Sequence, residues 1–327
     1  MLRIFHNTKY DFIKWWKVAA IATFAFMAIG VASFAVTGGV NYSVEFTGGT
    51  LVQLKFKGPA DAGRIRSVLD AAGIRGAEVQ QFGGPDEFIV RAQDKSLVSQ
   101  QAAGAEKIAD QIKTALSTAL GDSAFTVARK ESISPKVGEE LSRNAVLAMV
   151  LVSLATLIYL AFRFEWRFGV AAVVATLHDT IVTIAFVKLL HLEVSLTVVA
   201  AILTLLGYSM NDTIIIFDRV RENLKTSGKD ALYNVLNRSI NDTLPRSIMT
   251  HATTFAASLA LLVFAGEVIR PFAWVMTFGI FVATFSSIYV AGPVLIWIEE
   301  RFPRKSASGA AARPEASAKR AGAAVSR

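Results

Sequence analysis

The chain has 327 residues, of which 53% are hydrophobic, and it carries a formal net charge of +8. A soluble domain needs more polar surface than this composition supplies, so we predict a membrane protein. Lysine and arginine in the loops beside membrane spans explain the charge, and because no basic patch with interleaved aromatic residues is present, we expect no nucleic acid as a partner. The chain has no cysteine, which excludes disulfide bonds, zinc–thiolate sites and thiol catalysis.

Residues 1–17 form a short basic leader, and residues 18–36 form the first apolar segment. A helix of this length just crosses roughly 30 Å of hydrocarbon. The apolar run is longer than that of a typical signal peptide, so we predict an uncleaved transmembrane helix. Four cations precede it and place the N-terminus in the cytoplasm: Arg3, Lys9, Lys14 and Lys17.

Residues 37–143 have the composition of a small soluble domain, which this orientation places outside the cytoplasm. We predict elements in the order βαββαβ, the order of a ferredoxin-like α+β fold. Its acidic residues lack metal-ligand spacing, and Gly48-Gly49 lacks the lysine of a phosphate-binding loop, so we predict a tight turn there. The expected strands are 44–56, 77–82, 87–92 and 125–131, and the expected helices are 60–72 and 100–120.

Residues 144–303 contain five further apolar segments long enough to cross the membrane. Cations gather in the loops after the second and fourth helices, which predicts a polytopic α-helical membrane protein with six transmembrane helices and both termini in the cytoplasm. Residues 304–327 are rich in alanine, serine and basic residues, and we predict a disordered cytoplasmic tail suited to contact with anionic lipid. The five segments are 144–162, 168–190, 194–217, 247–265 and 272–298.

The fourth apolar segment carries Asn211 and Asp212 inside its length. A carboxylate at membrane depth costs roughly 2.5–3.5 kcal/mol on insertion scales, so it normally faces a bundle interior and has a function there. Helical spacing places Thr204 and Tyr208 on the same side as these two residues. We therefore predict a polar seam along this helix.

The third and fifth segments add further polar groups at membrane depth. His178 and Asp179 lie near the middle of the third, and Arg246 begins a stripe on the fifth that continues through Thr250. On neighbouring antiparallel helices Asp212 and Arg246 can pair, and movement of the arginine would then change whether the carboxyl holds a proton. The alternative is a static buried salt bridge, with Asp179 merely hydrogen-bonded to its neighbours. Buried ion pairs stabilise poorly once desolvation is counted, which favours the functional interpretation.

Four motifs carry a resemblance to a known family: residues 44–50 (VEFTGGT), 177–179 (LHD), 207–223 (GYSMNDTIIIFDRVREN) and 241–254 (NDTLPRSIMTHATT). With them, residues 10–303 resemble the SecF side of the bacterial SecD/SecF family of protein-export membrane proteins, part of the RND-type permease superfamily. Glu45 stands where this family often has aspartate. Pro245-Arg246 and His251 replace small hydroxyl residues, and we expect His251 to be a packing residue rather than a second titrating group.

The resemblance implies a subunit of the Sec machinery in the bacterial inner membrane. It would pair with SecD and work beside the SecYEG channel and YajC, and the proton motive force would drive the export of preproteins. No covalent reaction and no cofactor are expected, so the chain is not predicted to be an enzyme. The family's proton-pathway aspartate and arginine match Asp212 and Arg246, and we add Asp179, Asn211 and Thr250 to the candidate pathway. Two other functions stay open, a half-transporter that exports a lipid or small molecule and a passive translocon scaffold, and so does sodium in place of the proton.

Overall fold

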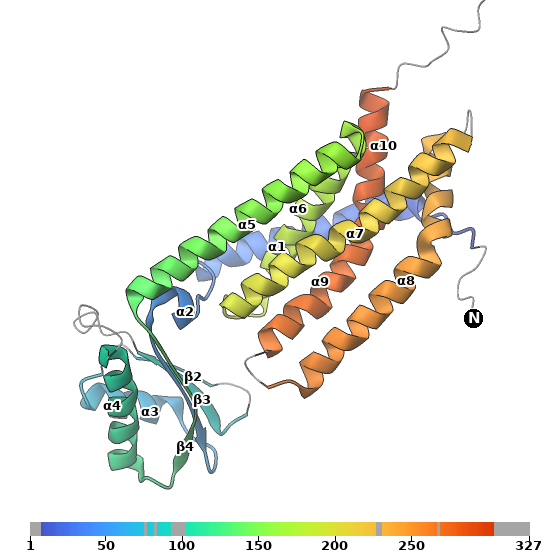
Figure 1. The fold of residues 1–327 in the computed structure, drawn as a ribbon. Coiled ribbons are helices and arrows are strands. Elements are labelled where there is room, and N and C mark those ends of the chain that lie inside the picture. The colour runs from blue at the N-terminus through green and yellow to red at the C-terminus, as the bar shows by residue number, and fades with distance from the viewer. Residues whose placement is uncertain are drawn as a thin grey trace, which may run out of the picture.

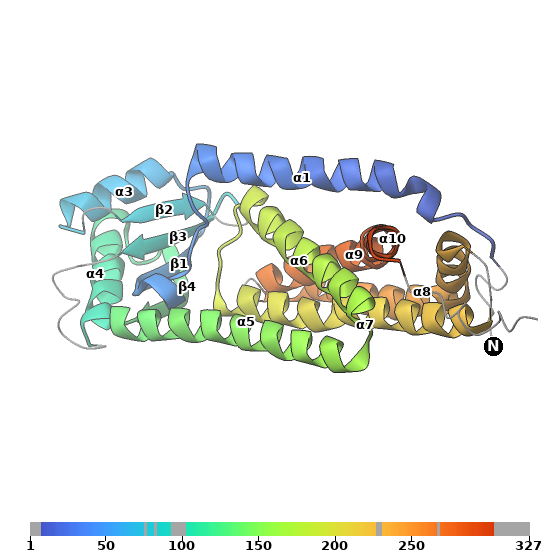
Figure 2. The same cartoon turned by 90° about the horizontal axis from the view of Figure 1, so that it is seen from above.

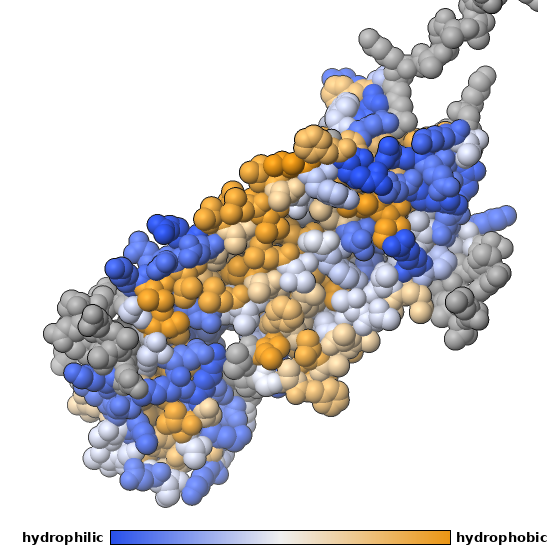
Figure 3. All heavy atoms as spheres, viewed as in Figure 1, coloured by the Kyte–Doolittle hydropathy of each residue, from blue (hydrophilic) through white to orange (hydrophobic). Residues whose placement is uncertain are grey.

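The chain forms a bundle of long helices with a small sheet domain at one end (Figure 1). The computed structural model describes residues 8–74, 77–81, 84–92, 103–226, 231–266 and 269–303. The first seven residues of the predicted leader and the predicted disordered tail at 304–327 lie outside these ranges. Figure 3 shows hydrophobic residues in a band across the helical part, with hydrophilic residues over the sheet domain and at the opposite end. This distribution is the one expected of a membrane-spanning bundle.

The sheet domain has the predicted ferredoxin-like topology. Its four strands lie in the order β2-β3-β1-β4, and each neighbouring pair is antiparallel. Its core is formed where the apolar face of the sheet meets two helices, and it includes Leu54, Phe88, Leu69 and Ile112, all nearly or fully buried. The elements are β1 (Gly49–Phe56), α3 (Ala62–Ala71), β2 (Glu78–Gln81), β3 (Glu87–Ala92), α4 (Ala103–Leu120) and β4 (Phe125–Ile133).

The predicted strand at 44–56 is wrong in its first third. Val44–Thr47 forms a short helix, α2, because the Ser43 side chain accepts a hydrogen bond from the backbone N–H of Glu45 and caps the first turn. The predicted tight turn follows it: Gly48 and Gly49 have φ angles of 69° and 123°, a region that glycine adopts without strain.

Six helical segments among the described residues are long and apolar enough to cross a membrane. They confirm the predicted number of spans. The helices that form them are α1 (Trp16–Thr37, after a short 3-10 turn η1 at Ile13–Trp15), α5 (Pro135–Arg163), α6 (Trp166–Leu189), α7 (Leu196–Thr226), α8 (Leu232–Phe264), α9 (Arg270–Tyr289) and α10 (Ala291–Arg301).

Several helix boundaries differ from the sequence-based ones, among them the end of α7 at Thr226 rather than 217. Helix α8 begins fifteen residues before the predicted start at 247 and contains Pro245 in its interior, since Val235, Leu236 and Ile240 bury an apolar face of this earlier part in the bundle core. Helix α5 begins at 135 rather than 144. The last predicted span is two helices that meet at Val290, where the ring of Pro293 conflicts with the backbone one turn earlier.

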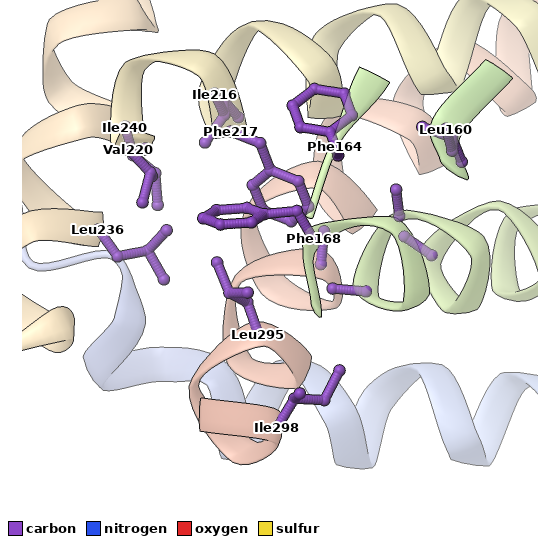
Figure 4. Packing of buried hydrophobic residues seen from close by; sticks show 14 of the residues in the cluster. Leu160, Phe164, Phe168, Ile216, Phe217, Val220, Leu236, Ile240, Leu295 and Ile298 are labelled. Carbon is purple, nitrogen blue, oxygen red and sulfur yellow. The ribbon is translucent and has the colours of Figure 1, made fainter. Parts of the chain in front are cut away.

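The largest apolar cluster of the bundle lies at the end away from the sheet domain (Figure 4). Phe168 of α6 packs edge-to-face against Phe217 of α7, with ring centroids 5.3 Å apart. Leu236 of α8 and Leu295 of α10 complete the contact, and all four side chains are fully buried. This cluster fixes four helices relative to one another and so holds the polar residues further along them in place.

Two glycines allow a test of how closely the helices pack. A methyl group added at Gly30 of α1 would lie 2.4 Å from the Cβ of Ala185 of α6, whereas one added at Gly207 of α7 would meet nothing within 4 Å. Alanine normally stabilises a helix by about 1 kcal/mol relative to glycine. We therefore expect Gly30→Ala to lower the thermal stability of the detergent-solubilised protein, because overpacking costs about 1–3 kcal/mol, and the control Gly207→Ala to leave it equal or higher. Equal stability of both variants would contradict the close contact of α1 and α6.

Candidate functional site: two buried carboxylates

Asp212 lies in the middle of α7 and is 3% exposed. One carboxylate oxygen accepts a short hydrogen bond from the Ser247 hydroxyl of α8. The other accepts a hydrogen bond of 2.8 Å from the Ser287 hydroxyl of α9. The carboxyl group therefore joins three helices, and its described partners are hydroxyl groups.

Asp179 of α6 forms a second centre of the same kind and is 7% exposed. Its Oδ2 accepts hydrogen bonds from Ser209 of α7 and from Ser286 of α9, the latter 2.7 Å long. Its Oδ1 lies 2.9 Å from Nδ1 of His178, whose Nε2 lies 2.6 Å from the Thr23 hydroxyl of α1. With Asp179 ionised, Nδ1 carries the proton and Nε2 accepts from Thr23.

Ser286 and Ser287 connect the two centres. These neighbours on α9 are both fully buried, and each donates to a different carboxylate. On α7, Ser209 contacts Asp179 and lies three positions before Asp212, on the same face of the helix. The two carboxyl groups therefore belong to one polar layer inside the bundle.

The predicted pathway residues fall into two groups. Asp212 and Asp179 are in the buried layer, while Arg246, Asn211 and Thr250 are exposed on the surface of α7 and α8. Among the described residues Arg246 forms no ion pair with Asp212 in this conformation; its neighbour in the chain donates to that carboxylate instead. The hydroxyl of Thr250 donates to backbone carbonyls of its own helix.

The predicted polar seam of α7 divides in the same way. Thr204 and Asn211 are exposed, whereas Ser209 and Asp212 are buried, because a residue one position further along a helix is turned by about 100°. Tyr208 lies between the two sides, and its hydroxyl donates to the Thr250 carbonyl over 3.3 Å.

His251 is buried, as the packing interpretation expects. Its ring lies edge-to-face on that of Tyr208, with centroids 5.4 Å apart. Its Nδ1 has no hydrogen-bond partner within the described ranges. The contact is with an aromatic ring, and the interpretation of His251 as a packing residue stays a prediction.

Sequence reasoning missed the hydroxyl groups that bond to the two carboxylates and to His178. Their residue type gives little signal, because serine and threonine are common in membrane helices and often bond only their own backbone. One signal existed: Ser209 precedes Asp212 by three residues, and two adjacent serines interrupt the last apolar span. The missed residues are Thr23, Ser209, Ser247, Ser286 and Ser287.

The sheet domain is attached to the start of α7, the helix that carries Asp212. The Glu45 carboxylate accepts a hydrogen bond of 2.5 Å from the backbone N–H of Leu196, the first residue of α7. A parallel β-bridge joins Tyr42 to Val194 just before it. A carboxylate at a helix N-terminus is favoured by the helix dipole and satisfies an otherwise unpaired donor.

Two further contacts secure the same junction. Arg91 of β3 forms an ion pair with Glu193 in the loop between α6 and α7. Burial lowers the pKa of Arg91, an effect opposed by the nearby Glu78 carboxylate. On the other side of the loop, the Lys188 ammonium donates to the Gly39 carbonyl over 2.5 Å. The start of α7 and the loop before it are therefore held against β3 and against the segment that leads into the sheet domain.

Comparisons with known proteins match two parts of this chain to one family. A family model for the SecD/SecF GG motif matches residues 34–60, and one for the C-terminal part of the protein export membrane proteins SecD/SecF matches residues 112–301. The protein translocase subunit SecF of Gemmatimonas aurantiaca is 65% identical over 305 residues, covering 93% of this chain and 91% of that protein. The chain belongs to the SecD/SecF family. Its predicted membership and its six-helix fold with an α+β domain are thereby confirmed.

Other SecD/SecF proteins show how far the likeness extends. The SecF subunit of Vibrio alginolyticus is 39% identical over 285 residues, with 87% of this chain and 88% of that protein covered. The crystal structure of SecDF from Thermus thermophilus, described as a translocon-associated membrane protein, matches with a TM-score of 0.78 and 34% identity. That match covers 90% of this chain and 39% of the solved chain. The SecF-type unit thus corresponds to one part of a larger SecDF molecule.

Ser286 and Ser287 contact different carboxyl groups, so we predict that each serine is energetically coupled to one carboxyl group. Because Ser287 donates to Asp212 and not to Asp179, we expect the effects of Ser287→Ala and Asp212→Asn on unfolding to be non-additive by about 0.5–3 kcal/mol, the range for contacting residues. The control pair, Ser287→Ala with Asp179→Asn, should be additive within about 0.5 kcal/mol. Thermal unfolding of the three single and two double variants in detergent, each against the unaltered chain, measures both couplings. Equal coupling to the two carboxylates would contradict the assignment.

The junction at the start of α7 can be tested through its backbone amides. Replacing Glu45 by alanine removes the acceptor of the Leu196 N–H, so we expect hydrogen exchange to accelerate over the first turn of α7. Asp110→Ala is the matched control, because this exposed carboxylate pairs with Lys130 within the sheet domain. Exchange at the start of α7 that stays the same in both variants would show that Glu45 does not hold this helix.

Proposed function

We propose that this chain is the SecF-type half of a proton-driven translocase that helps preproteins leave the SecYEG channel, in the bacterial inner membrane with both termini cytoplasmic. The observation that carries the proposal is the pair of carboxyl groups buried at membrane depth and held by hydroxyl donors. Each ionised carboxylate loses several kcal/mol of hydration, which hydroxyl donors restore only in part. Such groups fit a role in which a proton is taken up and released. The chain's assignment to the SecD/SecF family supports the same role.

The hydroxyl contacts suit both protonation states. A serine hydroxyl donates to an ionised carboxylate, and the same hydroxyl can rotate and accept from a protonated one. Ser286 and Ser287 would therefore report a change at either carboxyl group to α9. A proton entering this layer changes the hydrogen bonds among α6, α7, α8 and α9 without any covalent reaction or cofactor.

Arg246 supplies the second state in this proposal. It precedes Ser247, the residue that contacts Asp212, so the two positions are separated by about 100° around α8. An arginine side chain is long, and a partial rotation of α8 would bring the guanidinium towards the carboxylate in place of the serine. The charged form of Asp212 would be favoured more strongly in that state than in the one seen here, where hydroxyl groups alone contact the carboxyl group.

A second membrane subunit would cover the polar face of α7 and α8. The amide of Asn211 and the guanidinium of Arg246 are exposed at membrane depth, and among the described residues neither side chain has a hydrogen bond. Lipid cannot satisfy these donors, so they mark a protein contact. The SecDF match leaves most of the larger molecule uncovered, and we infer that a SecD half-bundle lies on this face. SecYEG and YajC are further proposed partners, through the family resemblance alone.

Coupling to the preprotein would run through the junction at α7. A shift of this helix moves the Glu45 contact and the bridge at Val194, and with them the sheet domain. The two rival functions do not require that a movement of α7 reaches the sheet domain. A scaffold needs no titrating carboxyl group, and an exporter of lipids or small molecules needs a substrate path through the sheet domain.

Removing the charge of Asp212 tests the proposal. We expect Asp212→Asn to abolish most of the stimulation of translocation by an imposed pH gradient in vesicles that contain SecD, SecYEG and this subunit, because an amide cannot exchange a proton at neutral pH. Asp218→Asn is the control, since it makes the same change on the same helix at a half-exposed residue paired with Arg163.

The same vesicles separate the alternatives. Stimulation by a sodium gradient instead of a pH gradient would assign sodium as the coupling ion. Normal stimulation with Asp212→Asn would support the scaffold. Loss of translocation in both variants would point to a general defect of folding or assembly and contradict a specific role for Asp212.

A further inference from the structure

A groove of about 650 Å³ lies between α1, α6 and α10, on a different side of the bundle from the polar face of α7 and α8. Figure 2 shows α1 along one edge of the molecule, with α6 and α10 next to it on the side towards the middle of the bundle. Helix α1 contributes residues from Trp16 to Met27, and the opposite wall includes Leu177 and Ile181. The volume is within the range of sites that hold a small ligand, about 300–1,000 Å³.

The lining of the groove is apolar along most of its length. Ala20, Phe24, Val174 and Val294 are typical of it. The polar groups at its inner end, Thr23 and His178, are bonded to each other and to Asp179, so they do not call for a polar ligand. An occupant must therefore be a hydrocarbon over most of its length.

The length of the groove matches one leaflet of a bilayer. From Trp16 to Met27 the helix rises about 16 Å, whereas the hydrocarbon of a whole membrane is about 30 Å thick. A transmembrane helix of another protein would need the full thickness. The groove instead fits a chain that enters from the surface at the end away from the sheet domain and stops near the bilayer centre.

The N-terminal segment crosses the bundle at this end, from α1 to α8. The backbone of Tyr10 exchanges two hydrogen bonds with the Asn241 amide of α8, of 2.9 and 2.8 Å. The Asp11 carboxylate accepts from Tyr233 and Asn237, and these hydrogen bonds lower the pKa of Asp11. The segment thus connects α1 with α8 beside the outer end of the groove.

The outer end of the groove carries the groups that bind a phospholipid head. Trp16 and Trp297 line it and are 40% and 63% exposed, as is usual for tryptophan at a membrane surface. Lys17 is exposed, with its ammonium 5.9 Å from the centre of the Trp16 ring, and Lys14 is exposed on the same segment. The exposed carboxylate of Glu300 also lines this end.

We propose that the groove binds one acyl chain of a phospholipid with an amine in its head group, drawn from the leaflet at this end of the bundle. The phosphate would meet the lysines and the ammonium would meet Glu300, a combination that phosphatidylethanolamine offers and phosphatidylglycerol does not. The end of the chain would contact Thr23 and His178 and so pack against the hydrogen bonds of Asp179.

Photolabelling of the full chain in vesicles tests the proposal. The probe is phosphatidylethanolamine with a diazirine on one acyl chain, at trace level in phosphatidylglycerol vesicles, and peptide mass spectrometry maps the labelled residues. We expect several-fold more label on residues 20–27 and 177–181 than on the exposed apolar face of α5, which includes Leu147, Leu151 and Ile158. An even distribution over all lipid-facing helices would overturn the proposal.

Two variants of α1 sharpen the test. Ala20→Phe fills the groove and should reduce its label several-fold, whereas Ala22→Phe adds the same ring at an exposed position outside the lining and should not. Equal labelling of the two variants would overturn the site. If Ala20→Phe proves too unstable to purify, the map of the unaltered chain still tests the proposal, because it is an independent measurement. Equal labelling by a phosphatidylglycerol probe would overturn the choice of an amine head group.

Discussion

The structure depends on the hydrogen bonds between buried serine hydroxyls and the carboxyl groups of Asp179 and Asp212. Apolar packing brings the membrane helices together but is similar along each of them, so it sets their rotation only weakly. A carboxyl group inside the bundle requires a donor at a defined position, and four serines supply these donors from α7, α8 and α9. Thr23 of α1 joins the same layer through His178. The rotation of each of these helices is therefore fixed by the polar layer. In the proposed function, the same layer is where a proton would be taken up and released.

Polar residues on the two faces of α7 and α8 have different requirements. The inner face is satisfied within the chain, through hydroxyl donors on neighbouring helices. The outer face presents Asn211 and Arg246, which need groups that the described part of the chain does not provide. The helices thus pack around their own core, but their surface leaves these two polar groups unsatisfied at membrane depth. This is consistent with the correspondence of the chain to part of a larger SecDF chain.

Much of this architecture could be predicted from the sequence, because it follows from local patterns. The lengths of the hydrophobic segments predicted the six spans. Alternating hydrophobic residues bounded by turn residues predicted the strands of the sheet domain and their order along the chain. Asp212 and Asp179 were found because a charge at membrane depth is rare. The partners of these residues could not be predicted, since whether Ser287 faces a carboxylate depends on the rotation of α9 against α7. The predicted start of the fifth span failed for a related reason: Pro245 is a typical helix-start residue, and only the packing of Leu236 and Ile240 shows that the helix begins earlier.

The joint between α9 and α10 affects how a change in the polar layer spreads. Ser286 and Ser287 lie in the last turn of α9, which ends at Tyr289, and α10 begins at Ala291. Val290 keeps its own helical hydrogen bonds, to the Ser286 carbonyl and from the Val294 N–H, of 2.9 and 3.1 Å. Pro293, however, has no N–H to donate to the Tyr289 carbonyl, so the helical hydrogen bonding is interrupted beside it. A rotation of α9 that starts at Ser286 and Ser287 can therefore be absorbed at this joint, while α10 stays packed in the apolar cluster through Leu295 and Ile298. The last membrane span is thus two helices in series, α9 with the two serines and α10 with its side chains in the apolar cluster.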